Sequence, residues 1–259
     1  MAERTAARSS FPFLPPRTWL ALLCLAAVPL FFLDLSQPGF QENEGRYAAV
    51  AREMLLTGDW ITPHLNGEVF LNKPPLTFWL TALVFRAAGT TEAARLVCGL
   101  ATLATLLLLY DLGRLLWRPS TGAWAAAVFL TSALTPLEAR TLRPDPLVVL
   151  FLCLTLWGAV RVSQAGRKSP DILGQAAIWA GAGLGVMAKG LMGVALPALI
   201  LLPALTLAGG WKEARRYCPW WGPLLLAVLV LPWHIAAGLR TPGFWWDYVV
   251  NQHLLFFLD

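Results

Sequence analysis

The sequence predicts an all-α integral membrane protein with about seven transmembrane helices and further amphipathic helices on one membrane surface. Hydrophobic residues make up 57% of the 259 residues. Charged residues make up only 14%, against about 25% in soluble domains. Long apolar segments recur along the chain, separated by short polar loops. These observations exclude a soluble enzyme, a disordered chain and a small disulfide-stabilised scaffold.

Seven apolar segments are long enough, or nearly so, to cross a bilayer, which takes about 20 helical residues. The first is not a cleavable signal peptide, because its apolar run leads to Asp34 and Gln37 rather than to a small-residue cleavage site. The seven predicted spans are Thr18–Leu35, Arg95–Leu116, Gly122–Leu137, Leu147–Val162, Leu173–Met187, Leu191–Leu207 and Gly222–Leu239.

An eighth apolar segment, Pro75–Ala88, decides on which side of the membrane every later loop lies. As a helix it would be about 21 Å long, shorter than the hydrocarbon core of about 30 Å. If it lies in the interface, eleven basic and only four acidic residues fall on the amino-terminal side. The positive-inside rule then places that side in the cytoplasm. We therefore interpret residues 1–17 as a cytoplasmic tail and residues 18–259 as a transmembrane domain.

With this topology, four segments collect on the outer side of the membrane and are expected to carry the function. They hold nearly every polar residue that a cytoplasmic anchor does not explain. Within the long loop 36–94, the spacing of apolar residues over Asn43–Leu56 predicts a helix lying on the membrane surface. The four segments are the long loop 36–94, the loop Glu138–Pro146, a turn around Lys189 and the stretch Arg240–Asp259.

Several partners and cofactors are not indicated. The net charge of +5 does not point to nucleic acid, because no basic run exceeds two residues. The chain contains neither a phosphate-binding loop nor a dinucleotide-binding glycine pattern, so no nucleotide cofactor is expected. The four cysteines stand singly, which predicts packing residues rather than a metal site or a disulfide.

Charged residues just after the first span are the first candidate for chemistry. Glu42 and Glu44 could serve as a base or as metal ligands, and Arg46 could hold a phosphate with two parallel hydrogen bonds. The alternative is a solvated helix start, where acidic residues favour the positive end of the helix dipole.

Three further charges stand out on the outer side. Pro74 and Pro75 would hold Lys73 at the membrane surface, where it could bind a lipid phosphate or merely extend into the head-group layer. Asp145 lies between two prolines and is costly there unless paired. Lys189 lies between two apolar runs and needs an anion or carbonyl groups around it.

Taken together, one membrane face offers cations for a phosphate and carboxylates for a base or a metal, which is typical of group transfer from a lipid phosphate. In the aromatic-rich final region, His234 is the better metal-ligand candidate, alongside Asp145. The cations are Arg46, Lys73, Arg143, Lys189 and Arg240, and the carboxylates are Glu42, Glu44 and Asp145.

An ordered set of motifs carries a resemblance to a known family. They are Asn43-Glu44-Gly45-Arg46-Tyr47-Ala48, Ala51-Arg52-Glu53-Met54, Gly58-Asp59-Trp60 through Asn66-Gly67, Lys73-Pro74-Pro75-Leu76, Arg143-Pro144-Asp145, Ala188-Lys189-Gly190, Pro232-Trp233-His234 and Pro242-Gly243-Phe244-Trp245. The chain resembles the polyprenyl-phosphate-sugar-dependent glycosyltransferases, which include the aminoarabinose transferase of lipid A and the protein O-mannosyltransferases.

The resemblance implies a fold of the C superfamily of glycosyltransferases in the bacterial inner membrane, with a periplasmic active site. It also implies transfer of a sugar from undecaprenyl phosphate (or dolichyl phosphate) to a lipid (lipid A-like) or protein acceptor, with inversion and often with a divalent metal ion. Matching motifs would place Arg46, Tyr47 and Lys73 around the donor and Asp145 near the reacting groups. Lys189 and Arg240 match more loosely.

Two departures from the family pattern affect the expected mechanism. The usual Asp-Glu pair falls on Asn43 and Glu44, and an asparagine cannot accept a proton at neutral pH. Either Glu44 or Glu42 is then the base, or another group is, or the chain is inactive. The chain is also about half the family's length, which suggests an amino-terminal portion. A lipid transporter and a catalytically silent lipid-binding subunit are the alternative functions.

Overall fold

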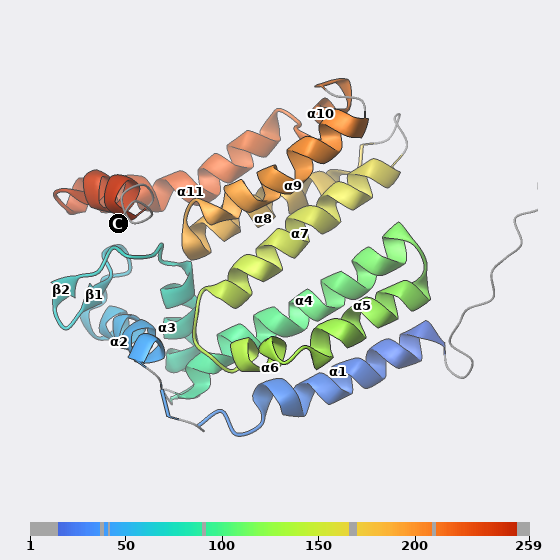
Figure 1. Cartoon of the computed structure of the whole chain (residues 1–259). Coiled ribbons are helices and arrows are strands. Elements are labelled where there is room, and N and C mark those ends of the chain that lie inside the picture. Colours follow the sequence, from blue (N-terminus) through green and yellow to red (C-terminus); the bar gives the residue numbers. More distant parts are fainter. Residues whose placement is uncertain are drawn as a thin grey trace, which may run out of the picture.

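The computed structural model describes residues 15–36, 39–40, 42–89, 92–165, 170–208 and 211–252. Most of the expected cytoplasmic tail and residues 253–259 lie outside this part. The described chain is helical apart from one antiparallel hairpin (Figure 1). The elements are α1 (Pro16–Phe32), α2 (Glu42–Thr57), β1 (His64–Leu65), β2 (Glu68–Val69), α3 (Leu76–Ala88), η1 (Glu92–Ala94), α4 (Arg95–Leu116), α5 (Pro119–Thr131), α6 (Leu134–Ala139), α7 (Asp145–Gln164), α8 (Ile172–Lys189), α9 (Met192–Ala208), α10 (Trp211–Tyr217), α11 (Trp221–Arg240) and η2 (Trp245–Asn251).

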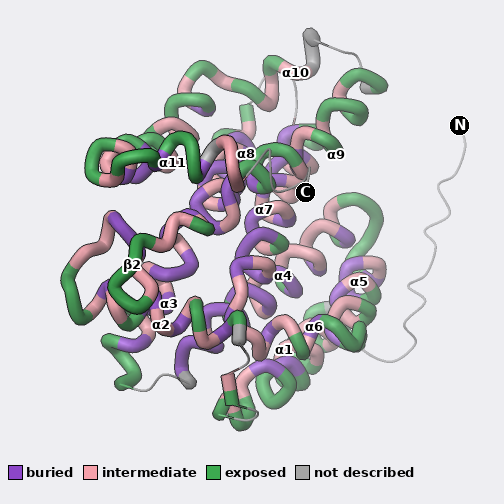
Figure 2. Tube along the Cα trace, turned by 60° about the vertical axis from the view of Figure 1, so that its left-hand side comes forward, coloured by how far each residue is buried: buried purple, intermediate pink, exposed green. Residues whose placement is uncertain are grey.

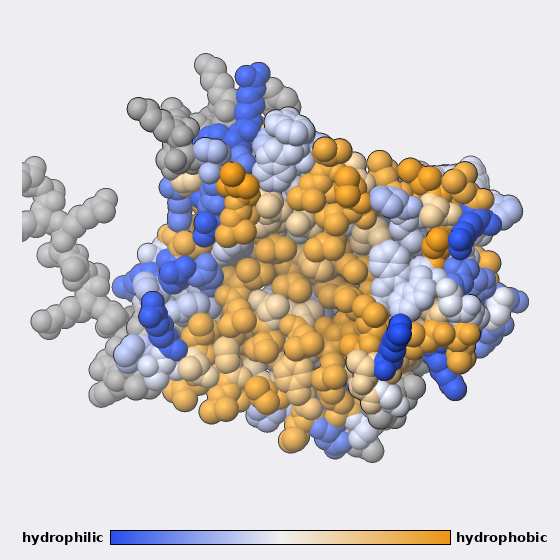
Figure 3. All heavy atoms as spheres, turned by 180° about the vertical axis from the view of Figure 1, so that it is seen from behind, coloured by the Kyte–Doolittle hydropathy of each residue, from blue (hydrophilic) through white to orange (hydrophobic). Residues whose placement is uncertain are grey.

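Within the described residues, four helices, α4, α7, α8 and α11, are long and apolar enough to cross a membrane. Helices α1, α3 and α9 are apolar but shorter. The chain is therefore a multi-pass membrane protein, but the expected count of seven spans is not confirmed. Figure 3 shows hydrophobic residues over the middle of one face, with hydrophilic residues gathered toward its two ends.

The predicted span Gly122–Leu137 is wrong as a single helix. The structure divides this region into α5, which ends at Thr131, and the short helix α6. Ser132 has an extended backbone, and its hydroxyl donates to the carbonyl of Val128 over 2.7 Å. Such local hydrogen bonds compete with helix continuation, which accounts for the break.

The helices run between two ends of the molecule (Figure 1). One end, here called the basic end, carries Arg215 and Arg216 on α10. Arg216 donates to the carbonyls of Val162 and Ala165, and Gln175 donates to the carbonyl of Arg216. At the other end, here called the loop-rich end, α2, the hairpin, α3 and α6 gather. Helix α3 lies there and packs beside α2.

Helix α2 matches the predicted surface helix closely, and its inner face packs on α3 and α4. Ala48, Val50, Ala51 and Met54 are buried there. Figure 2 shows the same pattern for the bundle, where buried stretches concentrate on α4, α7 and α8. The core thus lies along the middle of the bundle and supports the loop-rich end.

Glycines let neighbouring helices approach closely, as is common where membrane helices pack. A Cβ atom added at Gly122 on α5 would lie 2.2 Å from the carbonyl oxygen of Tyr110 on α4. A Cβ atom at Gly158 on α7 would lie 2.4 Å from the carbonyl oxygen of Gly174 on α8. These contacts are with backbone atoms, which cannot move aside as a flexible side chain can.

A Gly122→Ala variant is expected to lose stability because α4 and α5 must separate. Overpacking of this kind costs about 1–3 kcal/mol. Gly45→Ala is the matched control, since nothing lies within 4 Å of a Cβ atom at that helical position. Thermal unfolding in detergent should show a lower Tm for Gly122→Ala and an unchanged or higher Tm for Gly45→Ala. Equal Tm values would contradict the close approach.

Candidate active site

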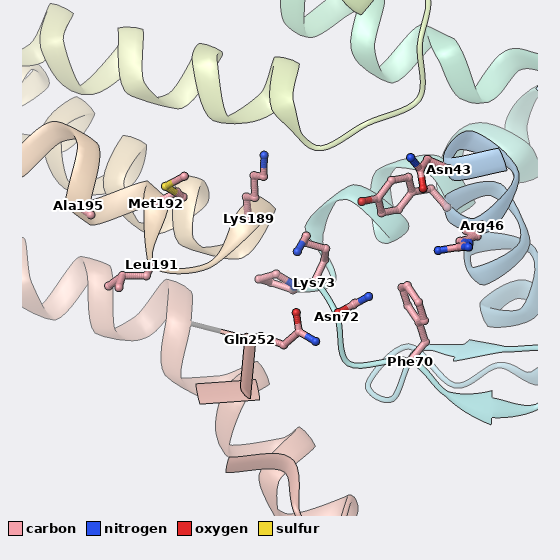
Figure 4. A pocket seen from close by; sticks show the side chains of 12 residues that line it. Asn43, Arg46, Phe70, Asn72, Lys73, Lys189, Leu191, Met192, Ala195 and Gln252 are labelled. Atoms are coloured by element: carbon pink, nitrogen blue, oxygen red, sulfur yellow. The ribbon is translucent and has the colours of Figure 1, made fainter. Parts of the chain in front are cut away.

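A cavity of about 430 Å³ opens at the loop-rich end, and we call it the first cavity. Figure 4 shows side chains from α2, the segment before α3, the α8–α9 turn and the carboxyl-terminal region pointing toward it. Three of them are cationic. The lining residues are Asn43, Arg46, Tyr47, Phe70, Asn72, Lys73, Pro74, Lys189, Leu191, Met192, Ala195 and Gln252.

Lys73 is held by a rigid segment between the hairpin and α3. The hairpin turns at Asn66 and Gly67, both with positive φ. Their N–H groups donate to the carboxylate of Glu53 on α2, over 2.5 and 3.1 Å. On the other side of Lys73, Pro75 caps the first turn of α3. The segment therefore presents Lys73 to the cavity with little freedom of its backbone.

The electrostatics of the first cavity favour an anion. Burial lowers the pKa of Lys73, and the nearby positive charge of Lys189 lowers it further, while Asp145 opposes the shift. Burial also raises the pKa of Tyr47, so its phenol stays neutral. The two ammonium groups repel each other, and Asp145, which pairs with Lys189, offsets only one of the positive charges. A phosphate group would offset the other.

Asp145 and Lys189 form an ion pair at the edge of the first cavity. Lys189 is the last residue of α8, and Asp145 is the first residue of α7, where the helix dipole favours a negative charge. The side chain of Asp145 is 46% exposed. The carboxylate is thus accessible and close to the cations, as its influence on the pKa of Lys73 also indicates.

A second cavity, of about 360 Å³, lies between α4, α5, α6 and α7. Arg143 lines this cavity rather than the first and pairs with Glu138 over 3.5 Å. The expectation that Arg143 joins the other cations is therefore not met. The lining residues are Thr102, Thr105, Phe129, Leu134, Thr135, Glu138, Arg143, Asp145, Pro146 and Val149.

Glu44, the first candidate for the base, lies in a buried ion pair instead. Arg95 donates to both of its oxygens, over 3.0 and 2.9 Å, and the N–H of Leu142 donates to it over 2.8 Å. The side chains of Glu44 and Arg95 are only 3% and 2% exposed. A carboxylate so enclosed cannot meet an acceptor, so its placement does not favour the expected role. The side chain of Glu42 lies outside the described residues.

Arg95 was not among the predicted site residues, because it was counted as the start of an apolar span. Its guanidinium also donates to the carbonyl of Leu35 over 2.6 Å, which ties the end of α1 to α4. The signal available in the sequence was a positive charge at the first residue of an apolar helix, which is costly without a partner such as Glu44. Phe70, Asn72 and Gln252 in the first cavity carry no such signal.

The residues expected to hold a metal do not come together. His234 is buried, with Nδ1 2.8 Å from the carbonyl oxygen of Val230 and its ring against Trp233 and Tyr248. Among the described residues, no group of three or more His, Cys, Asp or Glu side chains could hold a metal ion. These side chains do not fit the implied divalent ion.

Arg240 also lies away from the first cavity and pairs with Asp59 over 3.6 Å. Burial alone would raise the pKa of Asp59, but the N–H groups of Thr62 and Ile61 and the charge of Arg240 lower it below its usual value. Nearby, the indole of Trp233 donates to the carbonyl of Ile61 over 2.8 Å. These contacts fasten α11 to the long loop 36–94, so Arg240 helps to shape the site without lining it.

Comparisons with known proteins agree with this architecture. The sequence model of the dolichyl-phosphate-mannose-protein mannosyltransferase family matches residues 72–235. The undecaprenyl phosphate-alpha-4-amino-4-deoxy-L-arabinose arabinosyl transferase 2 of Sodalis glossinidius is 34% identical over 252 residues, which cover 93% of this chain and 44% of the relative. The corresponding transferase of Pseudomonas aeruginosa PAO1 is 32% identical over 239 residues, covering 90% of this chain and 43% of the relative.

Two solved structures are similar in fold. ArnT from Cupriavidus metallidurans bound to undecaprenyl phosphate has a TM-score of 0.81 and 27% identity, covering 91% of this chain and 44% of that one. The S. cerevisiae protein O-mannosyltransferase Pmt1-Pmt2 complex bound to the sugar donor has a TM-score of 0.63 and 15% identity, covering 94% of this chain and 35% of that one. The chain spans less than half the length of these relatives.

Proposed function

We propose that this chain, which belongs to the dolichyl-phosphate-mannose-protein mannosyltransferase family, is the donor-binding part of a membrane glycosyltransferase that moves a sugar from undecaprenyl phosphate. The observation that carries the proposal is the first cavity, where Arg46, Lys73 and Lys189 surround a space of about 430 Å³. The relatives named as arabinosyl transferases and the ArnT structure with undecaprenyl phosphate support this donor.

The lining of the first cavity suits both parts of such a donor. The three cations offer N–H donors to a phosphate, and the planar group of Arg46 can bind two of its oxygens. Leu191, Met192 and Ala195 form an apolar wall along the start of α9. We infer that the phosphate lies near Lys73 and that the polyprenyl chain leaves along α9 into the membrane.

The reaction transfers the anomeric carbon from the lipid phosphate to an acceptor oxygen. As the acceptor oxygen gives its proton to a base and bonds to this carbon, the bond from carbon to the phosphate oxygen breaks, and its electron pair stays on the polyprenyl phosphate. Attack opposite the leaving group inverts the anomeric centre. Lys73, Lys189 and Arg46 would stabilise the charge that develops on the phosphate, which is the main catalytic contribution we expect from this cavity.

We propose the bacterial inner membrane as the location, with the amino terminus in the cytoplasm and the first cavity on the periplasmic side. Arg17, Arg114, Arg118 and Arg215 are exposed at the basic end. Basic residues favour the cytoplasmic side. The acceptor would then be a periplasmic lipid, such as lipid A, or a protein.

Transfer of labelled aminoarabinose from its undecaprenyl phosphate donor, in membranes containing the full-length protein, tests this function. Arg46→Ala should reduce transfer strongly, because Arg46 lines the first cavity. Arg52→Ala is the matched control, an exposed arginine on the same helix that does not line the cavity. Equal transfer by the two variants would contradict the proposed donor site.

A catalytically silent lipid-binding subunit is the second candidate, and Asn43 favours it. Asn43 lines the first cavity at the position where the family's Asp is expected. A silent subunit would bind undecaprenyl phosphate without transfer, and Asn43→Asp would create activity. An active enzyme would transfer the sugar with Asn43 in place.

Donor binding should weaken at alkaline pH sooner than an ordinary lysine would allow. The lowered pKa of Lys73 means that its ammonium group loses its proton below the usual lysine pKa of about 10.4. Affinity for undecaprenyl phosphate should therefore be highest near neutral pH and fall as the pH rises toward that value. Lys73→Arg should move the fall to higher pH, and an identical pH profile for this variant would contradict the assignment.

A further inference from the structure

A third cavity, of about 490 Å³, lies between α8, α9, α10 and α11. It shares no lining residue with the first or the second cavity. Most of its wall is apolar and comes from α8 and α9, whereas Arg215, Tyr217 and Cys218 line it at the basic end. The third cavity therefore joins a space inside the membrane-spanning part of the bundle to a cation at one membrane surface.

The third cavity has the length of a hydrocarbon chain within one leaflet. It is lined along α9 from Val194 to Leu205, which corresponds to about 16 Å along a helix. The hydrocarbon core of a bilayer is about 30 Å thick, so one leaflet supplies about half of that distance. A lipid acyl chain lying beside α9 would thus extend along the whole cavity.

The wall of the third cavity is suited to hydrocarbon rather than water. Val194 and Leu202 line it and are exposed, so the cavity is open at its side. Along α8, the wall consists of Ile178, Trp179 and Ala182. Water stays in a cavity only where it finds two to four polar partners, and an apolar wall does not provide them. Within a bilayer, hydrocarbon would fill this space.

Exposed tryptophans mark the head-group level near the polar end of the third cavity. Trp220 directly precedes α11, and Trp117 directly follows α4. Both are exposed. Tryptophan is enriched where the hydrocarbon of a membrane meets its head groups. Arg215 and Cys218, which precede Trp220 by only a few residues, are therefore expected at the level of the phosphate groups.

Arg215 gives the third cavity a preference for an anion. It is exposed and forms no ion pair with any residue that the structure describes. The described residues that line the cavity include no Asp or Glu. Other arginines at the basic end already have partners, since Arg114 pairs with Asp111 and Arg161 pairs with Asp171. A guanidinium can bind two oxygens of a phosphate, and basic pockets between membrane helices suit anionic lipid head groups.

We propose that the third cavity binds an anionic phospholipid, with one acyl chain between α8 and α9 and with the phosphate on Arg215. The polyprenyl chain of the donor is also hydrocarbon, but its phosphate is assigned to the first cavity and would leave Arg215 without an anion. A bound phospholipid would fill the space between α8, α9 and α11 and so stabilise the folded protein. With the orientation proposed above, this lipid lies in the cytoplasmic leaflet, where anionic lipids are attracted to basic residues. Binding here does not depend on the function of the first cavity.

Lipid titration of the full-length protein in detergent micelles tests the head-group contact. Phosphatidylglycerol should raise the Tm by roughly 2 °C or more, and phosphatidylcholine with the same acyl chains should raise it less. Arg215→Gln should bind phosphatidylglycerol roughly tenfold or more weakly, because it loses a charge-assisted hydrogen bond. Arg118→Gln is the matched control, an exposed arginine at the basic end that does not line the third cavity. Its affinity should equal that of the wild type.

A second matched pair, on α9, tests the acyl-chain contact. Ala198 lines the third cavity, whereas Ala204 is exposed and does not line it. Ala198→Trp would occupy the cavity and should weaken phosphatidylglycerol binding roughly tenfold or more, while Ala204→Trp should leave it unchanged.

Four results would overturn the phospholipid site. They are an equal rise in Tm with both lipids, equal affinities of Arg215→Gln and Arg118→Gln, and no effect of either lipid on the wild type. The fourth is a loss of undecaprenyl phosphate binding in Ala198→Trp with phosphatidylglycerol binding unchanged, which would assign the cavity to the polyprenyl chain. Failure of the wild type to bind undecaprenyl phosphate would refute the proposed donor site and leave the phospholipid result as it stands.

Discussion

An Arg95→Met variant is expected to lose about 3–5 kcal/mol of folding stability, since it leaves the buried carboxylate of Glu44 without its partner. Arg95 donates to both oxygens of Glu44 and to the carbonyl of Leu35. Glu44 also accepts from the N–H of Leu142. The pair therefore joins α2, α4, the end of α1 and the loop before α7, and its loss should loosen the whole loop-rich end.

Denaturation of the purified protein in detergent would measure this loss, with Arg114→Met as the control. Arg114 lies in the last turn of α4 and pairs with Asp111, but its side chain is 47% exposed. Exposed pairs contribute only about 0–1 kcal/mol. Replacing both buried partners, in Glu44→Leu with Arg95→Met, should recover part of the loss. Equal stability of Arg95→Met and Arg114→Met would contradict the structural role of the buried pair.

A Lys73→Ala variant is expected to bind undecaprenyl phosphate roughly 10- to 100-fold more weakly, because it removes one charge-assisted hydrogen bond of about 1.5–3 kcal/mol. Transfer should fall at least as much, since the same ammonium group would stabilise the departing phosphate. Folding should be unaffected or slightly improved, as burial of the charged amine is unfavourable in the unbound protein.

Equilibrium titration with undecaprenyl phosphate measures this effect, and Arg86→Ala is the control. Arg86 is an exposed cation in the last turn of α3 and does not line the first cavity. Its removal changes the net charge by the same amount, so it separates a specific contact from a general electrostatic effect. If both variants bind with the affinity of the wild type, Lys73 does not contact the phosphate.

The sequence predicted helices and candidate cations better than it predicted which charged residues pair with each other. Spacing predicted the bounds of α2 to within one residue, and the two predicted cations Lys73 and Lys189 line the same cavity. Which carboxylate each cation meets depends on contacts between residues far apart in the chain. Glu44 meets Arg95, 51 residues away, and Asp145 meets Lys189, 44 residues away. No local pattern distinguishes these pairs from exposed charges.

The remaining differences arise from ion pairs formed outside the first cavity and from a local break in a helix. Arg143 and Arg240 carry the same charge as Lys73, yet they pair with Glu138 and Asp59 outside the first cavity. Hydropathy could not show the break between α5 and α6, because the residues on both sides are apolar and the interruption rests on a local hydrogen bond of Ser132.

The most direct test of the first cavity as the donor site is photocrosslinking with a polyprenyl phosphate that carries a photoreactive group beside the phosphate. We expect crosslinks to the segment around Lys73 and to the start of α9, near Leu191 and Met192, and we expect their loss in Lys73→Ala. Crosslinks concentrated near Arg215 at the basic end, or unchanged in Lys73→Ala, would contradict it.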